Sequence, residues 1–256
     1  MIDDGKDATD RPAVSHCTLR EAPALTPRFR QLFARSWPEF MFHGDVREWS
    51  SLIEFFPEFQ LALLGSEDEL VAAGQTVPIP WDGQAEDLPA TIDAIVARAN
   101  AARRQAITPR ALVAVAAMVD ADHRRRGLST TIVRGMRRLA REHGLGYLLA
   151  PLRPTLKERY PLIPLESYVT WTRADGAPFD PWLRVHARLG ARQLGIAPET
   201  LVVTGSVAEW ERWTAMRFPG SGRFVVPGAL QPVEIDRERD VGRYADPNVW
   251  MRHTLD

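Results

Sequence analysis

Residues 112–129 read LVAVAAMVDADHRRRGLS, and this stretch decides the fold that we predict. Its first eight residues are an almost unbroken apolar run, which is typical of a central strand buried on both faces. After the stretch, Ile132, Val133 and Met136 follow at helical spacing, and residues 147–152 are a second apolar run of strand length. The pattern therefore predicts a strand, turn, helix and strand unit of the parallel-sheet kind.

The turn of this unit, from Arg124 to Ser129, is a candidate phosphate site. A helix N-terminus that follows a buried strand presents unpaired backbone amides and the positive end of the helix dipole. Gly127 allows the backbone to approach an anion closely. One glycine beside three arginines also fits a solvated surface turn, so the residues alone leave both interpretations open.

The same turn, with the amphipathic helix after it, resembles the coenzyme A signature of the GNAT superfamily. Arg124, Gly127 and Ser129 occupy the three defining positions, with serine where glycine or alanine is usual. The resemblance implies that the turn holds a pyrophosphate and that the end of the preceding strand pairs with the pantetheine amides. The implied cofactor-binding residues are Met118, Val119, Arg124, Arg125, Arg126, Gly127, Leu128 and Ser129.

The resemblance covers roughly residues 15–215 and implies a single α/β (α+β) domain. We expect a mixed central sheet of about six to seven strands flanked by helices. No internal repeat or Gly/Ser-rich linker interrupts the chain. We therefore expect a polar, disordered tail over residues 1–13, a GNAT-like domain over 14–216, and an ordered C-terminal extension, 217–256, packed on that domain.

The composition excludes several classes of partner. Of the 256 residues, 45% are hydrophobic and 25% charged, and the formal net charge of −1 provides no net attraction to nucleic acid or anionic lipid. No apolar run is long enough to cross a bilayer, the N-terminus lacks a signal-peptide pattern, and Cys17 is the only cysteine. We expect a cytoplasmic protein, and no spacing of potential ligands predicts a metal site.

One histidine occupies a position that is held by a catalytic tyrosine in many members of the family that this sequence resembles. In many GNAT N-acetyltransferases, a tyrosine four residues before the glycine that ends the late helix protonates the departing thiolate. Here that segment reads HARLG, so His186 takes the place of the tyrosine and brings an imidazole that titrates near neutrality. Tyr160 and Tyr168 are minor alternatives for a displaced phenolic acid. No comparable positional argument applies to His16, His43, His123, His143 and His253.

A second resemblance concerns residues 151–171, PLRPTLKERYPLIPLESYVTW, and residues 175–191, DGAPFDPWLRVHARLGA. Both resemble the GNAT-like domains of polyketide synthase loading modules, which are associated with decarboxylation of malonyl or methylmalonyl thioesters. The resemblance implies that Thr155 and His186 are catalytic and that Trp37 is a wall of the acyl pocket.

Three functions remain open at this point. The leading hypothesis is decarboxylation of a malonyl or methylmalonyl group on coenzyme A or on acyl-carrier-protein phosphopantetheine, with or without acyl transfer, to prime polyketide-type synthesis. The second is coenzyme-A-dependent N-acetylation of an amine, and the third is a GNAT fold that binds thioesters without turnover. A carrier protein is acidic, so the basic turn near Arg124 suits its docking. The sequence does not determine the acyl chain, the acceptor or the oligomeric state.

Overall fold

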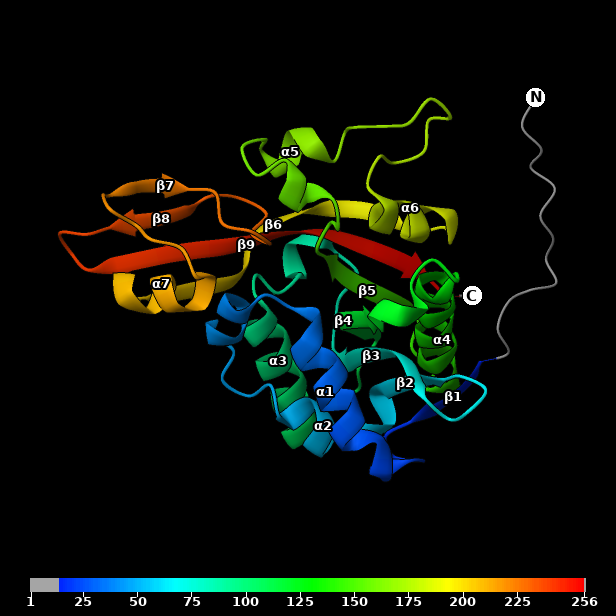
Figure 1. The fold of residues 1–256 in the computed structure, drawn as a ribbon. Helices are drawn as coiled ribbons and strands as arrows, with labels where there is room; N and C mark the ends of the chain where they lie inside the picture. Colours follow the sequence, from blue (N-terminus) through cyan, green and yellow to red (C-terminus); the bar gives the residue numbers. More distant parts are fainter. Residues whose placement is uncertain (1–13, 256) are drawn as a thin grey trace.

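The computed structural model describes residues 14–255, which form a nine-stranded sheet with helices on both sides (Figure 1). The strand order is β1-β2-β3-β4-β5-β9-β8-β7, and β6 also pairs with β9. The strands are β1 (Ser15–Thr18), β2 (Gln60–Leu64), β3 (Leu70–Ile79), β4 (Ala111–Val119), β5 (Tyr147–Leu152), β6 (Arg192–Gly205), β7 (Gly222–Phe224), β8 (Val233–Asp236) and β9 (Val241–Thr254). The helices are α1 (Thr26–Ser36), α2 (Ser51–Phe55), α3 (Ile92–Arg104), α4 (Leu128–Glu142), α5 (Leu165–Tyr168), α6 (Pro181–Arg188) and α7 (Val207–Thr214).

The predicted α/β class and its mixed sheet are confirmed. β1 to β4 pair antiparallel in chain order, whereas β4 and β5 are parallel and are connected through α4. The apolar face of α4 is buried on the sheet as its spacing predicts, with Ile132, Val133 and Met136 almost fully inaccessible. The strand, turn, helix and strand unit is therefore the centre of the fold.

Helices α1 and α4 cover opposite faces of the sheet, as Figure 1 shows. Neighbouring residues of β3 point to the two sides: Ala73 packs in one cluster with Phe29 of α1, while a Cβ added to Gly74 would meet Met136 of α4. Both faces of β3 and β4 are consequently covered, which is why the stretch 112–119 is apolar almost throughout.

The C-terminal segment is more than the packed extension that we expected. β9 lies inside the sheet between β5 and β6, where His253 is opposite Leu148 and Met251 is opposite Gln193. This strand, with β7 and β8, accounts for the difference between nine strands and the six to seven expected. Its apolar run is short and follows Asp246-Pro247-Asn248, so the sequence pattern conceals a buried interior strand.

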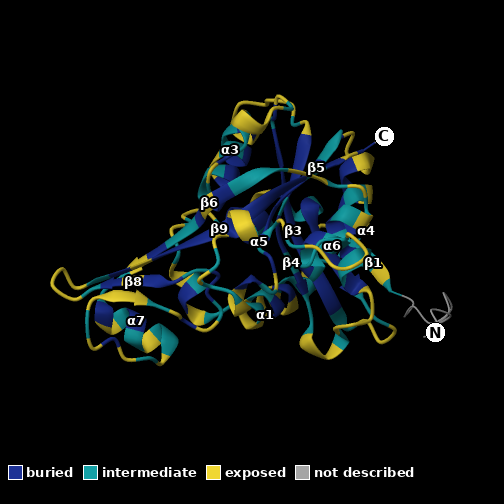
Figure 2. Cartoon of the chain, turned by 90° about the horizontal axis from the view of Figure 1, so that it is seen from above, coloured by how far each residue is buried: buried dark blue, intermediate teal, exposed yellow. Residues whose placement is uncertain are grey.

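The far half of β9 has a hydrophobic core of its own. Phe40, Trp210 and Tyr244 pack there with buried side chains of β6 and β8, beneath α7. Figure 2 shows that burial continues along β9 from the central sheet into this region. Residues 217–255 therefore stabilise the fold, and Asp246 and Asn248 of this segment also line the cavity described below.

Candidate active site

The two central parallel strands separate at the middle of the sheet. β4 and β5 pair only where residues 111–113 lie beside residues 147–149, although β4 continues to Val119. The register between β3 and β4 shifts between Gln75 and Thr76, so Val115 is the extra residue of a bulge that bends β4. The edge of β4 over residues 114–119 is left open toward a cavity, and such an edge can pair with an extended ligand.

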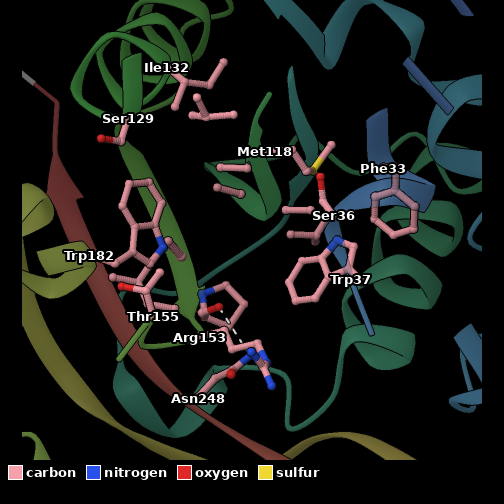
Figure 3. A pocket seen from close by; sticks show the side chains of 18 of the residues that line it. Phe33, Ser36, Trp37, Met118, Ser129, Ile132, Arg153, Thr155, Trp182 and Asn248 are labelled. Carbon is pink, nitrogen blue, oxygen red and sulfur yellow. Dashed lines mark hydrogen bonds between the residues drawn. The ribbon is translucent and has the colours of Figure 1, made fainter. Parts of the chain in front are cut away.

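A cavity of about 950 Å³ occupies the space between the separating strands (Figure 3). One wall is aromatic and comes from α1 and the segments after it. The opposite wall is polar and comes from the segment after β5 and from β6, β9 and α6. The aromatic wall contains Phe33, Trp37, Phe42 and Trp49, and the polar wall contains Arg153, Thr155, His186, Thr200, Asp246 and Asn248.

The predicted phosphate turn forms the mouth of this cavity. Gly127 has φ 77° and immediately precedes α4, and a Cβ added there would meet nothing within 4 Å. The first amides of α4 have no partner inside the helix, so they are available to an anion at this point. Of the predicted cofactor-binding residues, Met118, Val119, Arg124, Arg125, Gly127, Leu128 and Ser129 line the cavity, whereas Arg126 does not. The turn and the open edge of β4 thus fit the two parts of a phosphopantetheine arm.

His186 lies deep in the polar wall. Asp180 caps α6 by accepting hydrogen bonds from the amides of Trp182 (2.9 Å) and Leu183 (3.2 Å), and the helix places His186 with 1% exposure. Its Nδ1 lies 2.9 Å from Nε2 of His253, while its own Nε2 has no hydrogen-bond partner within residues 14–255. The Trp182 ring contacts the imidazole edge-on, with the ring centroids 4.6 Å apart.

Both imidazoles are neutral at physiological pH. Burial, with a smaller effect of His253, lowers the pKa of His186 to about 3. Burial, followed by the positive charge of Arg137, lowers the pKa of His253 to about 4. The expectation of an imidazole that titrates near neutrality is therefore corrected, because the position is dry. At neutral pH, His186 offers one lone pair and one N–H.

The two lowered pKa values predict that acid destabilises the fold. Above pH 6.5 both histidines are neutral in the folded and unfolded states, but below it the unfolded chain binds protons that the folded chain excludes. Between pH 7 and pH 5, we expect the free energy of unfolding to fall by roughly 2 kcal/mol for each buried histidine. Urea titrations at the two pH values measure this loss.

His186→Gln should reduce the acid-induced loss of stability, whereas His143→Gln should not, since His143 is exposed. An equal loss in the wild type and in His186→Gln would contradict the account of a buried neutral imidazole.

A single buried carboxylate brings the two predicted catalytic residues to one cavity. Asp180, which caps the helix carrying His186, also accepts a hydrogen bond from the amide of Leu156, 2.8 Å away and next to Thr155. Tyr168 donates to the same carboxylate at 2.9 Å, and burial raises its pKa. Neither Tyr168 nor Tyr160 lines the cavity, which removes the support for either as a displaced phenolic acid.

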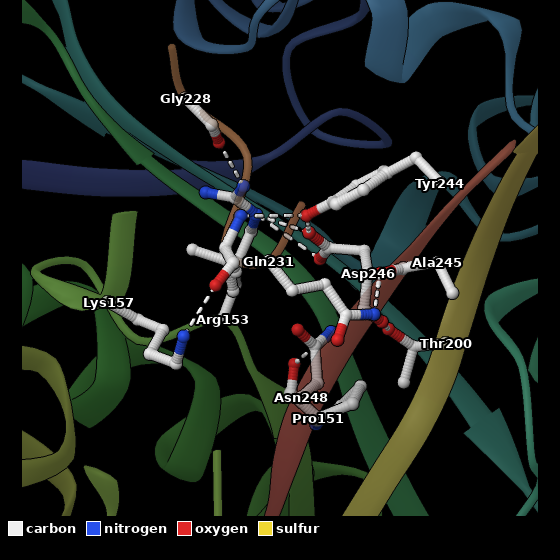
Figure 4. Close-up of polar contacts among 11 residues, drawn as sticks. Pro151, Arg153, Lys157, Thr200, Gly228, Gln231, Tyr244, Ala245, Asp246 and Asn248 are labelled. Atoms are coloured by element: carbon white, nitrogen blue, oxygen red, sulfur yellow. Dashed lines mark hydrogen bonds and ion pairs between the residues drawn. The ribbon is translucent and has the colours of Figure 1, made fainter. Parts of the chain in front are cut away.

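At one end of the polar wall, Arg153, Asp246 and Tyr244 form a network of hydrogen bonds that includes an ion pair (Figure 4). Nε of Arg153 lies 3.0 and 3.2 Å from the two carboxylate oxygens of Asp246, and the Tyr244 hydroxyl donates to the same carboxylate. Arg153 also donates to the carbonyl of Gly228, and its guanidinium lies 5.8 Å from the centre of the Trp37 ring. Asp246 neutralises Arg153, so this end of the cavity is polar without a free charge.

Two other kinds of site find no support between residues 14 and 255. No group of three or more His, Cys, Asp or Glu side chains in this part of the chain is arranged to hold a metal ion. None of its helices is both long and apolar enough to cross a membrane.

Known proteins resemble this chain in sequence and in fold. No protein-family model matches it. The arginine N-acetyltransferase avaD of Aspergillus versicolor is 32% identical over 276 residues, which cover 93% of this chain and 94% of that protein. The loading GNATL domain of CurA from Lyngbya majuscula has a TM-score of 0.60 at 15% identity, over 94% of this chain and 96% of that one. The GphF GNAT-like decarboxylase in complex with isobutyryl-CoA has a TM-score of 0.57 at 20% identity, over 95% and 99%.

The sequence similarity and the fold define an α/β acyltransferase, in which a cavity opens between two separating parallel strands. The chain belongs to the GNAT superfamily, since the similarity to avaD extends over nearly its full length. The structural neighbours establish the same fold at lower identity.

Proposed function

We propose that this protein is a coenzyme-A-dependent N-acyltransferase that moves an acetyl group to an amino or guanidino nitrogen of a small molecule. The observation that carries the proposal is His186, a neutral imidazole in the cavity wall whose Nε2 has no partner within the described residues. The sequence similarity to an arginine N-acetyltransferase supports it. The second of the three sequence-based hypotheses thereby moves ahead of the first.

The thioester would be held by the backbone rather than by a charged clamp. The open edge of β4 over residues 114–119 suits the pantetheine amides, and the first amides of α4 suit the pyrophosphate. Arg124 and Arg125 lie exposed at the mouth and would attract phosphate without restricting it. This arrangement directs the acyl group toward the polar wall.

His186 would move one proton between two substrate atoms. An acceptor that arrives as a cation first loses one proton to solvent. As the N–C bond forms and the C–S bond breaks, Nε2 takes the second proton, which the neutral acceptor nitrogen loses. The resulting imidazolium is strongly acidic in this dry position, so it gives the proton to the departing thiolate, whose thiol is a much weaker acid. Thr155, in the same cavity, would donate its hydroxyl hydrogen to the thioester oxygen.

The aromatic wall suits a cationic acceptor. Phe33 lies near Trp37, Phe42 and Trp49, with ring centroids 6.3, 5.9 and 5.2 Å away. Aromatic faces attract ammonium and guanidinium groups, and the exposed carboxylate of Glu158 also lines the cavity. Because Asp246 neutralises Arg153, no free cation at that end of the described cavity opposes such an acceptor. An amine or guanidine of modest size, such as arginine, is therefore the substrate class that we propose.

Decarboxylation of a malonyl or methylmalonyl thioester, on coenzyme A or a carrier protein, is the second candidate. It is favoured by Thr155 and His186 lining one cavity, because two donors there could stabilise the enolate and the apolar part of the lining would destabilise a carboxylate. That role requires a proton on Nε2 of His186, whereas acyl transfer requires a lone pair there.

Two incubations separate the candidates. The protein is mixed with acetyl-CoA and arginine or another small amine, and separately with malonyl-CoA alone, while free thiol and product masses are followed. We expect free coenzyme A and a singly acetylated acceptor only in the first mixture. Acetyl-CoA formed from malonyl-CoA without an acceptor, together with no acylated amine, would establish the decarboxylase instead. No turnover in either mixture would leave a non-catalytic thioester-binding fold.

A further inference from the structure

His253 is the residue behind the proposed base. It belongs to β9, opposite Leu148 of β5 and close to the C-terminus, and it has 1% exposure. Its Nε2 lies 2.9 Å from Nδ1 of His186, across 67 residues of sequence. Sequence reasoning assigned His253 no role, because no motif links the last strand to the helix that carries His186.

A hydrogen bond between two neutral imidazoles has one donor, so the pair has two arrangements. Either Nε2 of His253 carries the proton, and His186 must carry its own on Nε2, or Nδ1 of His186 donates and leaves its Nε2 as a lone pair. The two outer nitrogens, Nδ1 of His253 and Nε2 of His186, are both buried and have no hydrogen-bond partner within residues 14–255, so the neighbouring groups do not select between the two arrangements. Abstraction of a proton by Nε2 of His186 requires the second arrangement.

A nearby positive charge also keeps the two imidazoles neutral. Arg137 of α4 donates to the carbonyl of Leu189 at 3.1 Å, and its positive charge lowers the pKa of His253. Within residues 14–255, Arg137 is the charged side chain that acts on the two imidazoles. A carboxylate behind a catalytic histidine would stabilise the imidazolium and make the histidine more basic. A neutral imidazole such as His253 can orient His186 by a hydrogen bond without making it more basic.

We propose that His253 is a positioning residue that accepts the Nδ1 proton of His186 and so aims the lone pair of Nε2 at the acceptor nitrogen. The catalytic meaning of this arrangement rests on the proposed function. The choice of tautomer rests on it as well, whereas the hydrogen bond between the two buried rings does not. The arrangement also distinguishes proton abstraction from enolate stabilisation, which would need the opposite tautomer.

Two substitutions at the same position separate positioning from packing. His253→Gln keeps an acceptor, its amide oxygen, near the place of Nε2, whereas His253→Leu fills the space without one. We expect His253→Leu to lower kcat by roughly 10- to 100-fold with little change in the KM for acetyl-CoA, as is usual when the partner that orients a functional histidine is lost. His253→Gln should recover most of the rate. Equal kcat values for the two variants would overturn the proposal.

A spectroscopic measurement tests the tautomer without depending on turnover. In protein labelled with ¹⁵N-histidine at neutral pH, the shifts of the two ring nitrogens of His186 should show a proton on Nδ1 and none on Nε2. A proton on Nε2 in the wild type would overturn the proposal. The expected tautomer in a protein that acylates no amine would instead uphold the positioning role of His253 and reject the proposed function, so the two failures are distinguishable.

Discussion

Replacing His186 with alanine is expected to lower kcat for acetyl transfer by about 10²- to 10⁴-fold, the usual contribution of a positioned general base. The Kd for acetyl-CoA should change little, because the open edge of β4 and the amides of α4 hold the thioester. Steady-state kinetics and calorimetric titration with acetyl-CoA measure the two quantities separately.

His186→Gln serves as a second variant, since it fills more of the buried space than alanine and is equally unable to act as a base. His143→Ala is the matched control: it removes an exposed histidine outside the cavity, and both kcat and Kd should stay at wild-type values. If kcat and acetyl-CoA affinity fell in proportion in both His186 variants, the residue would belong to packing rather than to catalysis.

Gly127→Asp is expected to weaken acetyl-CoA binding by roughly 10- to 100-fold, because a carboxylate beside the pyrophosphate repels it even after solvent screening. The backbone tolerates the change: Gly127 has φ 77°, a region in which aspartate is comparatively common, and the added side chain meets no neighbour. An acidic residue preceding a helix also interacts favourably with the helix dipole. The fold should therefore remain as stable as the wild type, or become more stable, while ligand affinity falls.

Gly127→Asn is the matched control, since it has nearly the same shape and backbone preference but no charge. The difference in Kd between the Asp and Asn variants should shrink as the salt concentration rises, because an exposed electrostatic effect is screened. If the two variants had equal affinities for acetyl-CoA at low salt, the phosphate would not bind at this turn.

The sequence predicts the centre of the fold well and its C-terminal end poorly. Residues 112–119 are apolar almost throughout because both faces of β4 are buried in hydrophobic clusters, and α4 has a regular apolar face because it packs on one of them. β9 contacts three different environments in succession, the far core, the polar wall and β5, so its pattern is irregular and no periodicity reveals it. Strand pairing over such a distance along the chain is a tertiary property that local propensity does not contain.

In the candidate site, too, the sequence predicts some residues and misses others. Thr155, His186 and Trp37 were found through motifs, and all three line one cavity. The residues that position or balance them come from strands without a motif: His253 behind the imidazole, and Asp246 and Tyr244 beside Arg153. The sequence also could not reveal that His186 is too dry to titrate near neutrality, because burial depends on the whole fold.

The most direct test of the account is a crystal structure with acetyl-CoA and a non-reactive analogue of arginine, or with the two joined as a bisubstrate compound. The account predicts the pantetheine along residues 114–119, the pyrophosphate on the amides at the start of α4, and Nε2 of His186 within hydrogen-bond reach of the acceptor nitrogen, about 2.6–3.2 Å. A complex in which Trp182 separates His186 from the acyl carbon, with another group beside the acceptor nitrogen, would contradict it.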